Sequence, residues 1–150
     1  MWQTPKIDWE IKPRVNGRYQ GDWFNVEDCN RIIGNLRYLH AAGQNIYSVV
    51  FSLLGMKTKD RAGIPLAGDI NALEESLYRI VSNTFAPPNY TGKKTWLANG
   101  ATPTVDDLNR IERACKSIYE DLMSNADYKT YVPSGSTGYV TSDGKSYLVL

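Results

Sequence analysis

Residues 107–118 read Asp-Leu-Asn-Arg-Ile-Glu-Arg-Ala-Cys-Lys-Ser-Ile, an Asp-x-Asn tripeptide that opens a run of apolar residues at helical spacing. The same tripeptide occurs at residues 28–30 and 69–71, so the copies lie about 40 residues apart, the size of one supersecondary repeat. Apolar residues follow each copy at the same offsets. The chain is therefore predicted to be mainly α, with three similar helices that form a repeat bundle.

The apolar period and the end signals set the limits expected for each helix. The first is predicted over Val26–Ala42 and ended by Gly43, the second over Ala67–Phe85, and the third over Val105–Asn125. The side chains expected to face the common core are Cys29, Ile32, Ile33, Leu36 and Leu39; Ile70, Leu73, Leu77, Ile80 and Val81; and Leu108, Ile111, Cys115, Ile118 and Leu122.

Two of the three helix starts carry a capping-box pattern in which Asp replaces the usual Glu. Asn25 precedes Asp28 by three residues, and Thr104 precedes Asp107 by the same distance. The middle unit has Leu66 at the cap position, so Gly68 or Asp69 is expected to replace it. The helix-entry motif is assigned a structural role and consists of Asn25, Asp28, Asn30, Arg31, Asp69, Asn71, Thr104, Asp107, Asn109 and Arg110.

Two connecting segments separate the predicted helices. Residues 44–56 contain an apolar run that fits either a short helix or a buried strand, and the pattern does not decide between them. Residues 86–103 carry prolines and turn signals, and they are predicted to form a long connector that Trp96 docks onto the bundle.

The two ends of the chain differ from the predicted bundle over residues 25–125. Residues 1–24 hold three tryptophans without a helical period and are predicted to form an extended arm. Residues 133–150 are predicted to be a linker followed by a β-hairpin around Asp143-Gly144. Because arms and hairpins join subunits, the candidate partner contacts are Trp2, Trp9, Trp23, Tyr139, Tyr147 and Leu148. The alternative is that both ends fold back on their own bundle.

Composition and charge exclude several classes of function. The 150 residues suffice for one domain, and 17 Lys and Arg against 16 Asp and Glu give no net field for nucleic acid. No stretch approaches the ~18 apolar residues that a membrane span needs. Cys29 and Cys115 are expected to be small buried residues, and a single histidine, His40, does not make a metal site. No cofactor or metal is expected.

Catalytic patterns are also missing from the sequence, so no enzyme is expected. The adjacent acids Glu74-Glu75 and Asp106-Asp107 are interpreted as helix starts or exposed helix faces. Arg31 and Arg110 are interpreted as residues of solvated faces, although salt bridges or a partner contact are alternatives.

Three stretches carry a resemblance to a protein family. Phe24–Ile32, preceded by Trp2–Trp9, resembles the opening of structural proteins of tailed bacteriophages and prophages of Gram-positive bacteria. Residues 69–74 and 107–119 resemble the second and third helix motifs of the same group. Ile33 departs from the pattern, because the other two units have Glu at that place, and it suggests that the first helix is buried on an additional face.

The resemblance implies an oligomeric virion protein of the tail tip, baseplate or fibre attachment, made in the host cytoplasm and without enzymatic activity. Its implied partners are copies of itself and other virion proteins. The short C-terminal hairpin favours an adaptor over a receptor-binding fibre. One alternative is a head decoration or head–tail joining protein. Another is a carbohydrate-binding module that uses Trp96, Tyr90 or Tyr139 for a host-surface glycan, and a wall-degrading enzyme is the third.

Overall fold

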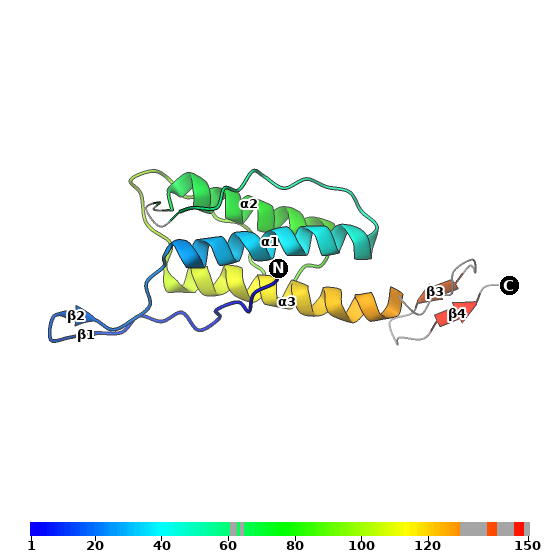
Figure 1. Cartoon of the computed structure of the whole chain (residues 1–150), viewed down its shortest axis with the longest axis horizontal. Helices are drawn as coiled ribbons and strands as arrows, with labels where there is room; N and C mark the ends of the chain where they lie inside the picture. The colour runs from blue at the N-terminus through cyan, green and yellow to red at the C-terminus, as the bar shows by residue number, and fades with distance from the viewer. Residues whose placement is uncertain (61–62, 64, 130–137, 141–145, 149–150) are drawn as a thin grey trace.

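The computed structural model confirms a mainly α chain built on three packed helices (Figure 1). It describes residues 1–60, 63, 65–129, 138–140 and 146–148. The helices are α1 (Val26–Tyr47), α2 (Ala67–Asn83) and α3 (Val105–Lys129). Helix α1 contacts both α2 and α3, and α2 also contacts α3. Each helix therefore covers the apolar stripes of the other two.

The core is formed by the residues that the periodicity places on one face of each helix. All fifteen predicted core side chains are buried, and Leu36, Leu39, Leu77, Ile80, Ile118 and Leu122 are completely inaccessible. Both cysteines are buried in this cluster as free thiols, and burial raises the pKa of each. The loops add Trp9 and Met56, which are also buried.

Helix α1 does not end at Gly43, as the sequence analysis predicts, but continues to Tyr47. Its C-cap is Ser48, which takes the left-handed conformation with φ of 54° and directs its N–H to the carbonyl of Gln44. Glycine is preferred at such a position, although it is not required. Gly43 lies inside the helix because the bundle needs a small residue there: a Cβ at Gly43 would lie 2.7 Å from Cγ2 of Thr84, which caps the C-terminus of α2.

Gly43→Ala is expected to lower the free energy of unfolding by about 1–2 kcal/mol, because the clash with Thr84 outweighs the higher helix propensity of alanine. Gly34 in the same helix is the control, since a Cβ there meets no atom within 4 Å. Gly34→Ala should instead stabilise the chain by up to ~1 kcal/mol. Urea unfolding followed by circular dichroism measures both. Thr84→Ser, which removes only the methyl group, should relieve the clash, and equal effects at the two glycines would contradict this account.

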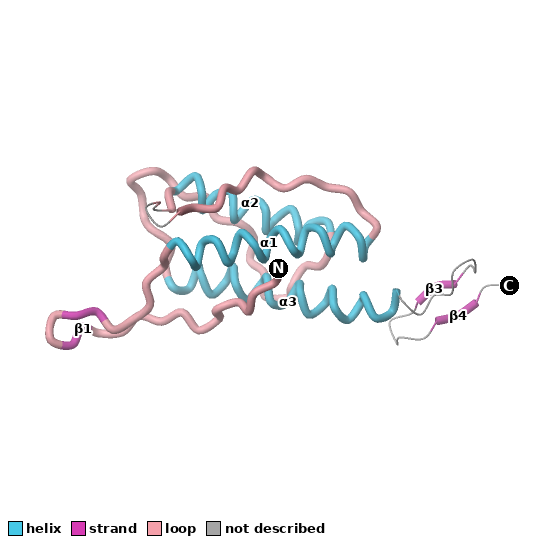
Figure 2. Tube along the Cα trace, viewed as in Figure 1, coloured by secondary structure: helices cyan, strands magenta, loops and turns pink. Residues whose placement is uncertain are grey.

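The other helix ends and the first connector also differ from their predictions. Helix α2 stops at Asn83, two residues early, and α3 continues four residues beyond Asn125. Residues 44–47 belong to α1, whereas residues 49–60 have no regular structure and run back along the bundle toward the start of α2 (Figure 2). Phe51, Leu53 and Met56 of this stretch pack on the core from a loop, whereas Val50 and Leu54 are exposed.

Two short antiparallel hairpins lie outside the bundle. The first pairs β1 (Arg14–Val15) with β2 (Arg18–Tyr19) and projects from the end at which α1 and α3 begin (Figure 1). It was not predicted, although Asn16-Gly17 is a strong hairpin signal and both residues have the positive φ of a type I′ turn. The second pairs β3 (Gly138–Val140) with β4 (Ser146–Leu148) as predicted. The linker at 133–137 and the turn at 141–145 lie outside the described residues.

Candidate interaction site

The three aspartates of the helix-entry motif act as local caps. Asp28 accepts a hydrogen bond from the N–H of Asn25 at 3.2 Å and returns its own N–H to the Asn25 side chain at 2.9 Å. Asp107 forms the same reciprocal pair with Thr104. In the middle unit Asp69 accepts the N–H of Leu66 at 2.8 Å, with no return bond from the leucine side chain. Each aspartate thus binds backbone groups at the first turn of its own helix.

The asparagines of the motif have a different task. The side chain of Asn30 accepts the N–H and donates to the C=O of Lys59, and both distances are 2.8 Å. Asn71 binds the backbone of Trp96 in this way at 2.7 and 2.8 Å, and Asn109 binds that of Trp9 at 2.9 and 3.0 Å. We call each of these two-bond contacts an amide clamp. Each clamp satisfies the polar backbone groups of an extended segment that packs beside a helix.

The clamps follow a cyclic order. Helix α1 holds the segment that leads into α2, α2 holds the segment that leads into α3, and α3 holds the segment that leads into α1. Each of these segments, which we call lead-ins, is thus fixed by the helix of the preceding unit. The three units are therefore linked to one another in a closed cycle of clamps.

Two buried ion pairs follow the same cyclic order. Arg31 of α1 binds Glu112 of α3, and Arg110 of α3 binds Glu74 of α2. Both glutamate side chains are only 1% exposed. Burial raises the pKa of Glu112, while Arg31 and the backbone N–H of Lys6 oppose the rise. Burial disfavours the charged form of Arg31 as well, but its carboxylate partners raise its pKa overall, so the guanidinium stays charged.

We call each Arg–Glu position between two helices a link of the cycle. The third link, between α2 and α1, is apolar. The residue of α2 that matches Arg31 and Arg110 is Ala72, and the residue of α1 that matches the two glutamates is Ile33. Both are buried in the core cluster. The arginine and the glutamate are therefore missing together, which explains Ile33 more directly than an additional buried face.

These pairs correct the interpretation of Arg31, Arg110 and Glu74 as residues of solvated or exposed helix faces. Helical periodicity shows which face of its helix a residue lies on. It does not show whether the neighbouring helix places a residue of opposite charge next to it. The alignment of the three units contained a signal for these ion pairs. Arg and Glu occur at fixed offsets after Asp-x-Asn, and both are replaced by apolar residues in the same link.

The tryptophans of the lead-ins pack beside these ion pairs. The Trp96 indole N–H lies 3.4 Å from the Glu74 carboxylate. The Trp9 indole lies close enough to Glu112 to favour the charged carboxylate, without meeting the geometry of a full hydrogen bond. Trp96 thus docks the connector, as predicted. It is half-buried against the core, as is Tyr90, so neither offers the open platform that the sugar-binding alternative requires.

Acid is expected to weaken the bundle through its capping aspartates. Burial disfavours the charge on Asp107 and Asp69, but Lys94 and Lys59 and the capping N–H groups outweigh it and lower both pKa values. The unfolded chain then takes up protons first, so this stabilisation is complete above pH ~4 and is lost as the pH falls further. Urea midpoints between pH 6 and pH 2.5 should drop less in Asp69→Asn/Asp107→Asn, which keeps the acceptor oxygens. An identical drop would contradict this origin.

Among the candidate partner contacts, the arm tryptophans have different environments. Trp2 stacks on Tyr119 with ring centroids 4.1 Å apart, and Trp9 is 4% exposed inside the bundle surface. Trp23 is 69% exposed. Tyr139, Tyr147 and Leu148 lie in β3 and β4, and their side chains fall outside the described part of the chain. Of the three tryptophans, Trp23 is the one available to a partner.

Trp23 belongs to a projection that we call the finger, residues 10–23. Its base is closed by Glu10 and Asp22: the N–H of Asp22 donates to the Glu10 carbonyl at 3.0 Å, and the N–H of Glu10 donates to the Asp22 carboxylate at 2.8 Å. At the tip, strand alternation puts the cross-strand pair Arg14 and Tyr19 on one face. The Trp23 ring meets Tyr19 edge-on at 5.1 Å, so it joins that face.

The finger is extra chain compared with the other two units. Lys59 lies 8 residues before the start of α2 at Ala67, and Trp96 lies 9 before the start of α3 at Val105. Trp9, held by the equivalent clamp, lies 17 residues before Val26. The lead-in that carries the finger is therefore 8 or 9 residues longer than the other two.

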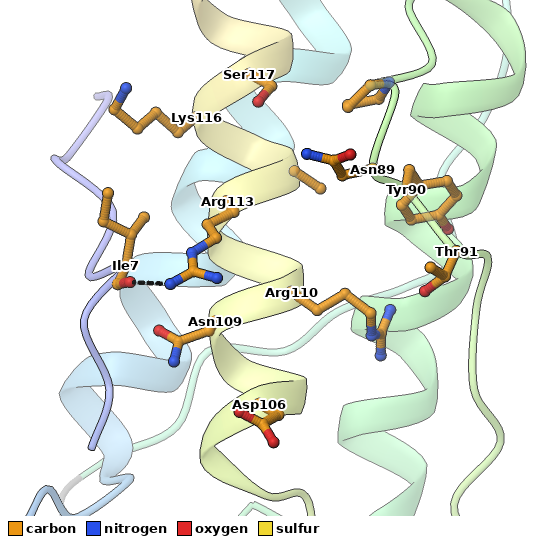
Figure 3. Close-up of a pocket in the computed structure, with 12 residues that line it drawn as sticks. Ile7, Asn89, Tyr90, Thr91, Asp106, Asn109, Arg110, Arg113, Lys116 and Ser117 are labelled. Atoms are coloured by element: carbon orange, nitrogen blue, oxygen red, sulfur yellow. Dashed lines mark hydrogen bonds between the residues drawn. The ribbon is translucent and has the colours of Figure 1, made fainter.

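A pocket of about 520 Å³ lies on the outer side of α3, between the arm and residues 87–91 (Figure 3). Arg113 points toward the arm and donates to the carbonyl of Ile7 at 3.1 Å, whereas Arg110 extends to the opposite side. Arg110, Arg113 and Lys116 line it together with a single carboxylate, Asp106. Two of these cations are paired, Arg110 with Glu74 and Lys116 with Glu120.

Among the described side chains, no group of three His, Cys, Asp or Glu is placed to hold a metal ion. None of the described helices combines the length and apolar character that crossing a bilayer requires.

Comparison with known proteins yields no relative. No protein-family model, curated protein or solved structure is similar enough to this chain to count as a match.

Proposed function

We propose that this chain is a non-enzymatic structural protein of a tailed-phage virion, an adaptor at the tail tip, baseplate or fibre attachment that works through contacts between subunits. The observation that supports it best is the finger, an insertion with a closed base that carries an exposed tryptophan away from the bundle. Exposed aromatic side chains on a defined surface are typical of protein interfaces.

The bundle itself suits a scaffold. Its polar motif residues are used internally: the aspartates cap helices, the asparagines clamp lead-ins, and both arginines pair with buried carboxylates. Contacts of this kind fix the base of the finger relative to the helices. A rigid scaffold lowers the entropy lost when a surface loop binds a partner.

The sequence resemblance provides the virion setting of the proposal. The helix-entry motifs that carry it are the residues of the caps and clamps, so the resemblance concerns the scaffold. The finger then supplies the contact by which such a scaffold joins a neighbouring subunit.

Purified particles test the proposal. Phage particles from cells that carry the gene are banded by density, heads and tails are separated, and the chain is detected with an antibody. We expect it in the tail fraction, and we expect Trp23→Ala to reduce its incorporation at least several-fold. Leu97→Ala is the matched control, because Leu97 is equally exposed, at 72%, but lies outside the finger. A chain found only with heads, or absent from particles, would overturn the proposal.

A further inference from the structure

We infer that the finger docks onto an acidic, apolar-lined surface of a different protein, with Trp23, Tyr19 and Arg14 as the central contacts. This rests on the proposed function, because it names the partner of the same projection. It goes further by stating the charge and chemistry of that partner.

The composition of one face of the finger is the first argument. Trp, Tyr and Arg are the residue types that carry most binding energy in protein interfaces, where they fill pockets at the centre of the contact. Here Arg14, Tyr19 and Trp23 share one face. Tyr19 also folds back over Gly21, where a Cβ would meet its hydroxyl at 2.2 Å, so its position is fixed before binding.

The charge of the tip is the second argument. At the base, Lys12 pairs with Glu10 at 2.6 Å and Lys6 pairs with Asp22 at 3.2 Å. At the tip, neither Arg14 nor Arg18 has a carboxylate partner among the described residues. A complementary partner surface would place carboxylates opposite these two guanidinium groups and an apolar pocket opposite the exposed indole of Trp23.

A second copy of this chain fits the finger poorly. Finger-to-finger contact would oppose Arg14 and Arg18 with the same residues of the copy, and like charges across an interface are unfavourable. The pocket on α3 offers the guanidinium groups of the finger one carboxylate, Asp106, and that carboxylate shares the pocket with Arg113. Electrostatics therefore favours a different chain.

A lipid surface fits less well than a protein. Membrane-binding segments separate an apolar face from a cationic one. On the finger, Arg14 shares the face of Trp23, whereas Val15 lies on the other face beside Arg18. The apolar side chains are thus divided between both faces and interspersed with arginine.

The purified full chain tests this with the random copolymer poly(Glu,Tyr), which combines carboxylates with aromatic rings. Binding is measured by isothermal titration at 50 mM and 300 mM salt. We expect binding that weakens with salt, and roughly tenfold weaker binding for Arg14→Glu and for Trp23→Ala. Lys57→Glu and Leu97→Ala are the controls, because both residues are exposed and lie outside the finger. They should bind within about twofold of the parent chain, the range of a non-contact change.

Each other outcome overturns the inference. The first is that the chain does not bind the copolymer, and the second is that Arg14→Glu binds it as tightly as the parent chain. The third is that the chain binds poly-Glu as tightly as poly(Glu,Tyr) and that Trp23→Ala does not weaken this binding. Self-association that Trp23→Ala abolishes in sedimentation velocity would assign the finger to a second copy. Binding to phosphatidylserine vesicles but not to the copolymer would assign it to a membrane. The proposed function stands or falls separately, because particle incorporation is measured without reference to the partner's charge.

Discussion

Replacing Glu112 with isoleucine is expected to lower the free energy of unfolding by about 3–5 kcal/mol, the cost of removing one partner of a buried ion pair. Isoleucine keeps a similar volume, but it leaves the guanidinium of Arg31, which is 16% exposed, with Asp28 at 2.7 Å as its one remaining carboxylate among the described residues. The backbone N–H of Lys6 also loses its acceptor, which lies 3.0 Å away in the parent chain. Urea unfolding followed by circular dichroism at neutral pH measures the change.

The chain itself supplies the compensating substitution. In the third link of the cycle, Ala72 and Ile33 stand where the other links have arginine and glutamate. Arg31→Ala combined with Glu112→Ile copies that link, so the double variant should regain most of the stability and come within about 1–2 kcal/mol of the parent. The recovery should be incomplete, because the Lys6 N–H still lacks its acceptor.

Two comparisons make this result decisive. Glu120→Ile removes the carboxylate of the exposed pair with Lys116, and it should change stability by less than ~1 kcal/mol. A double variant no more stable than Glu112→Ile alone would show that the apolar third link does not substitute for an ion pair. A fully stable Glu112→Ile would show that the pair does not hold α1 to α3.

Periodicity and capping explain why the helices and their core were predictable. Each of Ile32, Leu73 and Ile111 occupies the same offset after Asp-x-Asn, and each is buried. Such information is local, because apolar spacing and caps depend on residues within one helix. The N-terminal start of every helix was correct for this reason.

Contacts between units were not predictable in the same way. Asn30, Asn71 and Asn109 were assigned to the helix entries as structural residues, but their actual partners are backbone groups up to 100 residues away. An asparagine that binds a distant backbone and one that caps its own helix have the same pattern in sequence. Gly43 was misinterpreted for a similar reason, since its partner Thr84 belongs to another helix.

The candidate site was predicted only in part. Trp23 was among the expected contacts, but the expectation of an extended arm overlooked the turn at Asn16-Gly17 and so missed the finger. Trp9 was given the same role and is instead buried. The sequence offered one distinction between them: Trp9 occupies the lead-in position of Trp96, whereas neither of the other two units has a tryptophan three residues before its helix, where Trp23 lies.

The clamps also have unequal consequences for the fold. The lead-ins held by Asn30 and Asn71 are joined to a helix at both ends, so they stay close to the bundle without their clamps. The lead-in held by Asn109 continues into a helix, α1, on its C-terminal side. On its N-terminal side the described residues of the arm are held to the bundle by non-covalent contacts, among them the two hydrogen bonds between Asn35 and the backbone of Gln3.

Asn109→Ala is accordingly expected to release the arm around Trp9. The N–H and C=O of Trp9 lose two hydrogen bonds in a buried position, which costs about 2–4 kcal/mol. Hydrogen–deuterium exchange should show loss of protection centred on Trp9, because Asn35 still holds the backbone of Gln3 through two hydrogen bonds of 2.8 Å. Asn30→Ala and Asn71→Ala are matched controls, and in them faster exchange should stay close to Lys59 and Trp96. A Trp9 segment that keeps its protection in Asn109→Ala would mean that the other contacts of the arm, such as those of Asn35 with Gln3 and of Glu112 with Lys6, suffice to hold it.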